Sequence, residues 1–421
     1  MIDVHDIERC VGCGACVDAC PHGALAMVPD PEGFLRPQVN TTLCVDCGLC
    51  ENVCQIGRFS GSTSETNPWQ TSVASMYGAV ALEQNVTARS SSGGVFYLLA
   101  SEVIRCGGVV YGAAYGTPSG DSEKAVSPVE SPTASPVDLE VRHVRVTDQD
   151  GLAALQGSKY IQSRTAGIFA QVRDDLAADR RVLFSGTPCQ VAALKLFLGD
   201  TRTGLLTVDF ICHGVPSPGL WREYLAFVKK ETGRNVDWVT LRDKRKVTDR
   251  FHSCLKLIDR KPPYRPTEIY DKAIANLWIK IFLSNMAMRP SCHSCAFASS
   301  QRVSDITLAD FWGGEKTHKA LFDLGRGVSL VMCGTPRGEE AIKSILPQTV
   351  WEKAVEEDIR QPRLHSPAAA SPRRDAFWAD KARYGFGRKL AGKYLDYGFW
   401  QIIRRRLRAA FGAGRKKAVN V

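Results

Sequence analysis

The feature that most constrains this 421-residue chain is a short internal repeat near its beginning. The segments "CVGCGACVDACP" and "CVDCGLCENVCQ" both have the cysteine spacing C-x₂-C-x₂-C-x₃-C. The two runs are Cys10, Cys13, Cys16 and Cys20, and then Cys44, Cys47, Cys50 and Cys54. A cubane iron–sulfur cluster needs four thiolates converging from a tightly turned backbone, and Gly12, Gly14 and Ala15 permit that turn. Zinc, the alternative, usually takes two separated pairs, so the repeat favours two 4Fe–4S clusters.

The spacing also indicates which cysteines act together. In two-cluster ferredoxins the fourth cysteine of each run serves the other cluster. We therefore assign to one 4Fe–4S centre Cys10, Cys13, Cys16 and Cys54, and to the other Cys44, Cys47, Cys50 and Cys20. Residues 1–58 are predicted to form an α+β ferredoxin-like module with two clusters.

The rest of the chain shows the pattern of an α/β domain, expected over residues 73–365 after a polar linker at 59–72. "VLFSG" and "TPCQVAALKLFL" form a strand-then-helix unit in which Thr187 is the expected N-cap and Pro188 the first helical residue. "SPGLWREYLAFVKK" follows a strand in the same way, and "TPRGEEAIKSI" does so again. The stretch 117–138, rich in Pro and Ser, is expected to be an exposed loop.

Seven further cysteines lie outside the repeat. Cys292 and Cys295 form a C-x₂-C pair, and Cys189 and Cys212 each follow a strand-like segment, where α/β sheets place their sites. These four are enough for a third cluster. Cys106 and Cys333 have apolar neighbours and are expected to pack as small hydrophobes, whereas Cys254 has no assigned role.

Three interpretations of Cys189 remain open on the residues alone. A cysteine at a helix N-terminus is favoured as a thiolate, so Cys189 could ligate the third cluster, pack as a structural cysteine, or act as a nucleophile. The nucleophile needs a base, for which His213 is the candidate. The ligand interpretation is favoured, because cysteine enzymes do not usually carry ferredoxin modules.

Composition is that of a soluble globular protein, with 44% apolar and 23% charged residues. No stretch approaches the roughly 18–20 apolar residues that cross a bilayer, and no signal peptide is expected. We therefore expect a cytoplasmic protein. Fifteen cysteines in that compartment indicate metal or redox chemistry rather than disulfides.

The net charge of +10 is concentrated in a basic tail, assigned to residues 366–421. Residues 381–421 contain twelve Lys or Arg and a single acidic residue, Asp396. The tail could form an amphipathic helix on an anionic membrane, at the inner face. It could also contact an acidic partner such as a ferredoxin, or be a solvated terminus. The nearly neutral body excludes a broad nucleic-acid surface.

Several segments together resemble the beta-subunit family of coenzyme F-420 hydrogenases and dehydrogenases. They are "SSGGVFYLLA", "GSKYIQS", "GTPCQVAAL", "CHGVPSP" and "CHSCAFASSQRVSDITLADFWG". "GFLRPQVN", between the two cysteine runs, is similar to the ferredoxin module often fused to this family. The resemblance covers about residues 5–330, in consistent order.

The resemblance implies an α/β flavin- and iron–sulfur-binding domain that holds FAD beside a 4Fe–4S centre. It implies the same inner ligands that the spacing suggests. The residues expected near FAD are Gly93, Gly94, Lys159, Arg302, Asp305 and Asp310. The two glycines would offer helix N–H groups to a phosphate, Lys159 would counter the reduced flavin or a phosphate, and the two aspartates would orient the cofactor or Arg302. A flexible turn, a surface lysine and solvated acids are the alternatives, and His213 is a candidate proton donor.

The resulting hypothesis is an iron–sulfur flavoprotein oxidoreductase. It would pass electrons between ferredoxin-type clusters and, through FAD, a hydride-accepting substrate, coenzyme F-420 first among them. Its partner would be a ferredoxin or another redox protein. The alternatives are a ferredoxin-dependent reductase of an organic metabolite, in a polysaccharide or specialised-metabolite pathway, and a non-catalytic electron-transfer subunit.

Overall fold

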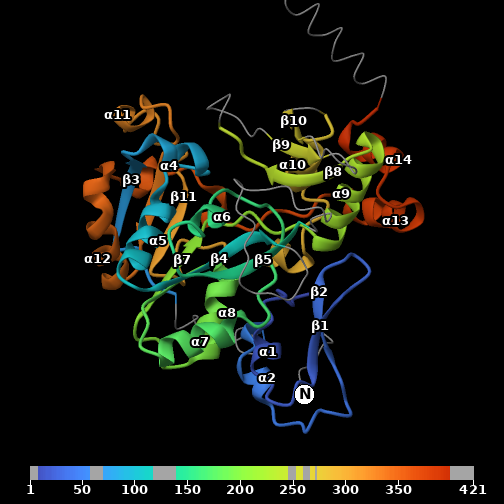
Figure 1. Ribbon diagram of the computed structural model, residues 1–421, viewed down its shortest axis with the longest axis horizontal. Coiled ribbons are helices and arrows are strands. Elements are labelled where there is room, and N and C mark those ends of the chain that lie inside the picture. Colours follow the sequence, from blue (N-terminus) through green and yellow to red (C-terminus); the bar gives the residue numbers. More distant parts are fainter. Residues whose placement is uncertain are drawn as a thin grey trace, which may run out of the picture.

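The computed structural model describes residues 8–56, 70–116, 139–244, 253–258, 266–270 and 273–398. Most of the predicted linker, the predicted loop at 117–138 and residues 399–421 of the basic tail lie outside these ranges. In Figure 1 the N-terminal module, in blue, lies against one side of a larger body built of mixed helices and strands. In the described part, no helix is both long enough and apolar enough to cross a membrane.

The N-terminal module consists of two short helices and a hairpin. Its elements are α1 (Ala15–Asp18), β1 (Leu25–Pro29), β2 (Leu35–Val39) and α2 (Leu49–Asn52). Strands β1 and β2 pair antiparallel, and each helix begins after a glycine with φ of 73°, Gly14 or Gly48. Because this left-handed conformation costs glycine almost nothing, both halves of the repeat make the same turn. The module has the predicted α+β character.

The main body is organised around an eight-stranded sheet with the order β13-β3-β12-β11-β7-β6-β4-β5. The strands are β3 (Ser75–Ala81), β4 (Val109–Gly116), β5 (Glu140–Val146), β6 (Val182–Ser185), β7 (Leu205–Phe210), β11 (Ile306–Asp310), β12 (Ser329–Cys333) and β13 (Thr349–Lys353). Strands β4, β6, β7 and β11 are parallel, whereas β5, β12 and β13 pair antiparallel with their neighbours. This parallel centre is the α/β core that the strand–helix units predict.

Helices cover both faces of this sheet (Figure 1). They are α5 (Val95–Arg105) and α12 (Pro336–Ile345) on one face, and α7 (Ile168–Ala177) and α8 (Pro188–Leu198) on the other. Side chains alternate along the central strands: Val110 and Leu183 pack under α5, whereas Val109 and Phe184 pack under α7 and α8. Since successive strand residues point to opposite faces, two cores form, and both need the apolar runs seen in the sequence.

The predicted helix starts are confirmed. At α8, the backbone N–H of Thr187 donates to Gln190 Oε1 (3.0 Å) in a capping box. At α9 (Pro218–Thr232) the Ser217 hydroxyl oxygen accepts from the N–H of Leu220, 3.1 Å away. Thr335 caps α12 in the same manner. Three strand-to-helix turns are therefore fixed by local sequence.

A second core, rich in aromatic side chains, lies beside the main sheet. It combines α9 with β8 (Asn235–Thr240), β9 (Cys254–Ile258), β10 (Pro266–Tyr270), α10 (Leu277–Leu283), α13 (Arg374–Tyr384) and α14 (Arg388–Leu395). The three strands form an antiparallel sheet. Phe34, from the hairpin of the N-terminal module, is fully buried in this core and contacts Trp378. The backbone N–H of Gly219 donates to the Gly33 carbonyl (3.1 Å), so the hairpin turn lies directly against α9.

The structure differs from the predicted basic tail in its first part. Residues 374–395 form α13 and α14, and Phe377, Trp378, Leu390 and Tyr394 are buried in the second core. Charge dominates the composition there. In α14 the apolar residues nevertheless recur at helical spacing, whereas α13 buries the adjacent pair Phe377 and Trp378. The remaining short elements are α4 (Gln84–Arg89), α6 (Leu152–Leu155), η2 (Pro290–Ser294), α11 (Lys319–Phe322), η3 (Leu346–Gln348), η4 (Glu356–Asp358) and η5 (Pro362–Leu364).

Candidate metal centre

Twelve cysteines fall into three groups of four. We call them the first group (Cys10, Cys13, Cys16 and Cys54), the second group (Cys20, Cys44, Cys47 and Cys50) and the third group (Cys189, Cys212, Cys292 and Cys295). The first two are those that the repeat predicts, and the third is the set nominated for an inner cluster.

The first group lies where the module meets the main body. Burial raises the pKa of Cys16 to about 12, and the nearby thiols of Cys10, Cys54 and Cys50 contribute to the rise. Burial likewise raises the pKa of Cys13, with contributions from Cys16, Cys10 and Cys54. The fourth cysteine of the second run thus lies with the first three of the first run, as the crossed assignment expects.

The second group lies at the outer end of the module. All four of its cysteines line a single small cavity, together with the backbone turn that starts at Gly48. Cys47 is exposed to solvent, and so are the apolar side chains of Leu43, Val45 and Leu49 around it.

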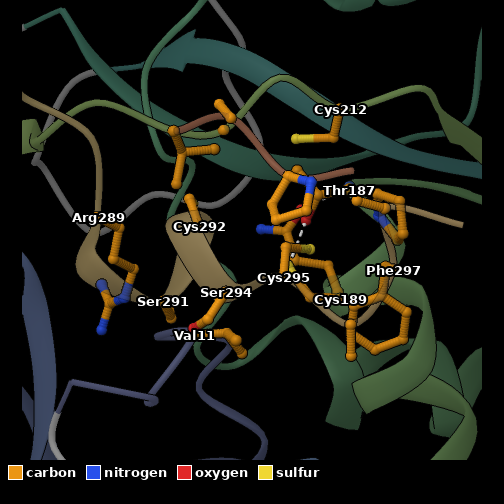
Figure 2. Close-up of a pocket in the computed structure, with 18 of the residues that line it drawn as sticks. Val11, Thr187, Cys189, Cys212, Arg289, Ser291, Cys292, Ser294, Cys295 and Phe297 are labelled. Carbon is orange, nitrogen blue, oxygen red and sulfur yellow. Dashed lines mark hydrogen bonds between the residues drawn. The ribbon is translucent and has the colours of Figure 1, made fainter. Parts of the chain in front are cut away.

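The third group surrounds a cavity of about 140 Å³ between the module and the main sheet (Figure 2). Cys189 lies in the first turn of α8, and Cys212 follows β7 by two residues. Cys292 lies in η2 and Cys295 directly follows it. These elements bring together residues from the carboxyl ends of two adjacent parallel strands and from the C-x₂-C loop, where α/β sheets concentrate their sites.

The environment of Cys189 is the opposite of an activated nucleophile. Its sulfur lies 3.1 Å from the Thr187 hydroxyl oxygen at the start of α8. Burial raises the pKa of Cys189 to about 12, and the neighbouring thiols of Cys295 and Cys292 contribute to the rise. Burial thus raises the pKa of this thiol, whereas a nucleophilic cysteine needs a lowered pKa.

The donor chemistry of the groups fits iron–sulfur clusters. Each group offers four cysteine sulfurs, the soft ligands that select iron–sulfur clusters or zinc. Within the described ranges, no three His, Cys, Asp or Glu side chains are arranged to hold a single metal ion. In the second and third groups, four thiols around a shared cavity suit a multi-atom cluster.

The first and third groups are joined by direct contacts. The side-chain amide of Gln55, next to Cys54, donates to the carbonyl of Cys189 at 2.8 Å. Arg289, three residues before Cys292, donates from Nε to the carbonyl of Cys10 at 2.6 Å. The third-group cavity is lined partly by residues of the module, among them Val11 and Gln55.

The other three cysteines lie apart from these groups. Cys254 and Cys333 are buried in β9 and β12, which is the packing role predicted for Cys333. Cys106 is exposed just after α5, and its sulfur lies 3.6 Å from Glu102 Oε1. The prediction that Cys106 packs in the core was wrong, because α5 ends at Arg105 and turns the cysteine outward.

The two glycines predicted for FAD stand where β3 and α5 approach each other. The N–H of Gly93 donates to the hydroxyl of Ser329 (2.9 Å), and a Cβ at Gly93 would lie 2.2 Å from the carbonyl oxygen of Ala79. Gly94 begins α5 with φ of 92°. Gly93 is thus required for close backbone packing, and its N–H already has a partner inside the protein.

The predicted charged residues are separated from one another. Lys159 is buried and its ammonium donates to three carbonyls that end α6, Ala154, Leu155 and Gln156. Burial lowers the pKa of Lys159 to about 7. In this arrangement all three ammonium hydrogens are used to close the end of a helix.

The aspartates do not orient Arg302. Arg302 is buried and pairs with Asp209 (3.2 Å), which the sequence interpretation did not include. Asp305 accepts from the backbone N–H and hydroxyl of Thr207. Asp310, at the end of β11, pairs with Arg242 at 2.6 Å.

His213 lies beside the third group and lines its cavity. Its Nε2 is 2.9 Å from Asn285 Oδ1, and its ring packs against Phe282. Burial lowers the pKa of His213, so the neutral ring is favoured at pH 7.

These observations define a class: a mixed α/β protein with a ferredoxin-type 4Fe–4S domain and a further cysteine group at its sheet edge. Comparison with family models gives two matches. Residues 9–57 match the model of a 4Fe–4S dicluster domain, and residues 179–358 match the model for the C terminus of the coenzyme F420 hydrogenase/dehydrogenase beta subunit. All four cysteines of the third group lie within the second matched region.

Among solved structures, the chain is similar to a chain of the F420-reducing [NiFe] hydrogenase complex from Methanosarcina barkeri. The two share 14% sequence identity with a TM-score of 0.41, over 82% of this chain and 95% of that chain. Among curated proteins, no relative matches.

Proposed function

We propose that this chain is an iron–sulfur flavoprotein oxidoreductase that carries electrons between a redox protein and a hydride acceptor, coenzyme F-420. The observation that carries the proposal is the arrangement of three four-cysteine groups. They run from the exposed second group, through the first, to the third group at the carboxyl ends of β6 and β7. When bound, 4Fe–4S clusters in these groups would supply single-electron transfer, and FAD would exchange hydride.

Hydrogen bonds between the module and the main body support this arrangement of the groups. Gln55 and Arg289 hold the first group against the third by hydrogen bonds to backbone carbonyls. Thr165 adds a hydrogen bond from its hydroxyl to the carbonyl of Cys13 (2.6 Å). Because these bonds act on the cysteine backbones themselves, they position the ligands directly rather than through flexible side chains.

The flavin site would lie at the carboxyl edge of the sheet. Gly94 lies at the start of α5, and Asp310 is the last residue of β11. The family resemblance supports FAD in this region. His213, neutral beside Cys212, is the candidate for holding a proton.

A second candidate is an electron-transfer subunit without flavin. The observation that favours it is that Lys159, Arg302 and Asp305 direct their polar atoms to other groups of the protein. Such a chain would need a catalytic partner to show turnover.

Anaerobic purification with iron, sulfide and flavin analysis tests both candidates. The proposal expects about 12 irons with one FAD per chain, corresponding to three four-iron clusters. It also expects oxidation of reduced F-420 coupled to reduction of the clusters. Full iron content without flavin would favour the second candidate, and absence of iron would overturn both.

Cys189→Ser tests the third group. The variant is expected to lose about four irons per chain and to keep the two clusters of the module. Cys106→Ser, at an exposed cysteine outside the groups, is the matched control and should keep all the iron. Unchanged iron in Cys189→Ser with lost turnover would instead support the nucleophile interpretation.

A further inference from the structure

We propose that Arg289 is a buried cation that raises the reduction potential of the cluster held by the first group. The inference rests on the proposed function, in which the first and third groups hold 4Fe–4S clusters. It assigns to this chain's own Arg289 a role that the cysteine spacing does not contain.

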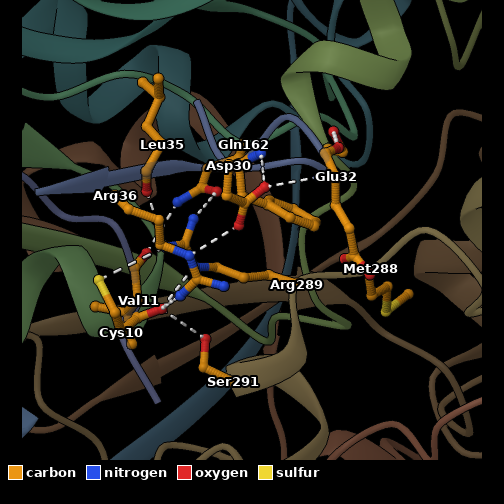
Figure 3. A network of polar contacts seen from close by, with 12 residues as sticks. Cys10, Val11, Asp30, Glu32, Leu35, Arg36, Gln162, Met288, Arg289 and Ser291 are labelled. Carbon is orange, nitrogen blue, oxygen red and sulfur yellow. Dashed lines mark hydrogen bonds and ion pairs between the residues drawn. The ribbon is translucent and has the colours of Figure 1, made fainter. Parts of the chain in front are cut away.

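Arg289 is enclosed by the protein and aimed at Cys10 (Figure 3). Its exposed fraction is 0%. Nε donates to the Cys10 carbonyl at 2.6 Å, and Nη2 lies 3.6 Å from the Cys10 sulfur. Nη1 donates to Gln162 Oε1 at 2.8 Å, Nη2 donates to the Leu35 carbonyl at 2.9 Å, and the guanidinium lies over the ring of Phe34.

Among the described residues, the contacts of Arg289 include no carboxylate. Within the described part of the chain, no Asp or Glu forms an ion pair with Arg289, whose partners are carbonyls, an amide, an aromatic ring and a thiol. A guanidinium keeps its charge in proteins, and a buried charge is costly unless an anion compensates it. The neighbouring Arg36 shows the contrast: it also donates to the Cys10 carbonyl (3.1 Å) but is paired with Asp30 at 2.9 Å.

Gly12 leaves space for the contact between Arg289 and Cys10. A Cβ at Gly12 would lie 2.6 Å from Arg289 Nη1 and 2.8 Å from Gln162 Nε2. The glycine between the first two cysteines therefore allows the guanidinium to reach Cys10. Gly12 is thus required both for the left-handed turn and for the approach of the Arg289 guanidinium.

The position of Arg289 extends its effect to the third group. Its backbone carbonyl accepts from the N–H of Cys292 at 2.9 Å, so it lies one turn before that cysteine. Arg289 therefore contacts one ligand of each group, Cys10 through its guanidinium and Cys292 through its backbone carbonyl.

A 4Fe–4S cluster with four cysteines is anionic and gains negative charge on reduction. A fixed positive charge in a low-dielectric surrounding stabilises the reduced form more than the oxidised form. Local charge is among the factors that set cluster potentials. The Arg289 guanidinium should therefore make the first-group cluster easier to reduce than it would be without this charge.

The test is a redox titration followed by electron paramagnetic resonance on the full-length, anaerobically purified protein. Arg289→Met is expected to lower the equilibrium constant for reduction of the first-group cluster by about tenfold, which is about 59 mV for a one-electron couple. The second-group cluster should keep its potential. Arg289→Lys keeps the charge and should show less than half of that change.

The matched control is the double variant Asp30→Asn with Arg36→Met. It removes another hydrogen bond to the Cys10 carbonyl but no net charge, so the first-group potential should remain within about twofold in equilibrium constant of the wild type. An equal shift in control and Arg289→Met would overturn the proposal, as would an unchanged potential in Arg289→Met.

If Arg289→Met loses iron, Arg289→Lys decides. A lysine variant with full iron and near-wild-type potential supports the charge effect, whereas iron loss in both variants reduces Arg289 to a structural clamp and overturns it. Wild-type protein without iron would contradict the proposed function itself, whatever the variants show.

Discussion

The two halves of the cysteine repeat share their backbone geometry but not their surroundings. Gly12 and Asp46 occupy the same repeat position and both have left-handed backbone, with φ of 66° and 55°. Gly12 is pressed against Arg289, whereas Asp46 lies at the surface. A non-glycine residue is thus tolerated in this turn where space is open, and excluded where the main body approaches.

Five further positions differ between the halves. They are Ala15 against Leu49, Val17 against Glu51, Asp18 against Asn52, Ala19 against Val53, and Pro21 against Gln55. Ala15 is buried under α7 and α8, whereas Leu49 is exposed. The cysteine spacing therefore sets the ligand pattern of both halves, and the other positions set how each half contacts the main body. Ala15 does so from the first half, and Val53 and Gln55 do so from the second.

The largest expected effect comes from placing alanine at the shared turn position. Gly12→Ala should destabilise the contact between module and body by about 3 kcal/mol, the upper end for overpacking, because Arg289 and Gln162 are both held by hydrogen bonds. Hydrogen exchange at α1 should then accelerate by about two orders of magnitude. Asp46→Ala is the control with the same backbone conformation. The free energy of opening that hydrogen exchange measures at α1 should change by less than about 1 kcal/mol in this variant. Equal effects in the two variants would contradict the conclusion that the main body excludes a side chain at position 12.

A smaller effect is expected at the end of α1. The Asp18 carboxylate accepts from the backbone N–H groups of Gly167 (2.5 Å), Phe169 (2.9 Å) and Ala170 (3.3 Å), and so caps α7 from the module. Asp18→Ala should cost about 1–2 kcal/mol, through lost capping and lost charge at the helix N-terminus. Exchange at the start of α7 should rise about five- to thirtyfold.

The control is Asn52→Ala, at the matching position of the exposed half. Exchange at α7 should remain unchanged in that variant. If Asp18→Ala also left α7 exchange unchanged, the carboxylate would contribute nothing to the contact between the two parts.

The sequence predicts what depends on short-range spacing. The two cysteine runs, the N-caps at Thr187 and Ser217, and the strand–helix units all follow from residues a few positions apart. The crossed assignment of Cys54 needed in addition the known ligation pattern of two-cluster ferredoxins.

Contacts between distant positions were not predictable from one sequence. Arg289 and Cys10 are separated by 279 positions, and Arg302 pairs with Asp209 rather than with the aspartates beside it. Arg289 lies three residues before the C-x₂-C pair, and no local sequence pattern indicates that this basic residue is buried. For α13 and α14, the charged composition drew attention away from a few apolar residues, and the second core against which they pack could not be located from sequence.

The smallest effect is expected at the last position of the two runs, where Pro21 corresponds to Gln55. Gln55 replaces the proline that ends the first run, and its amide donates to the Cys189 carbonyl, so this single substitution between the repeats links the first group to the third. Gln55→Leu should cost about 1 kcal/mol, the net value of one hydrogen bond, and raise exchange at the start of α8 about fivefold. Pro21→Ala, the matching position beside the exposed second group, should leave exchange at α8 unchanged.

Since the Cys189 carbonyl belongs to a cluster ligand, Gln55→Leu should also broaden the third-group electron paramagnetic resonance signal while iron content stays constant. A spectrum and exchange rates identical to the wild type would mean that the two halves differ in packing alone, and that the link between groups depends on Arg289.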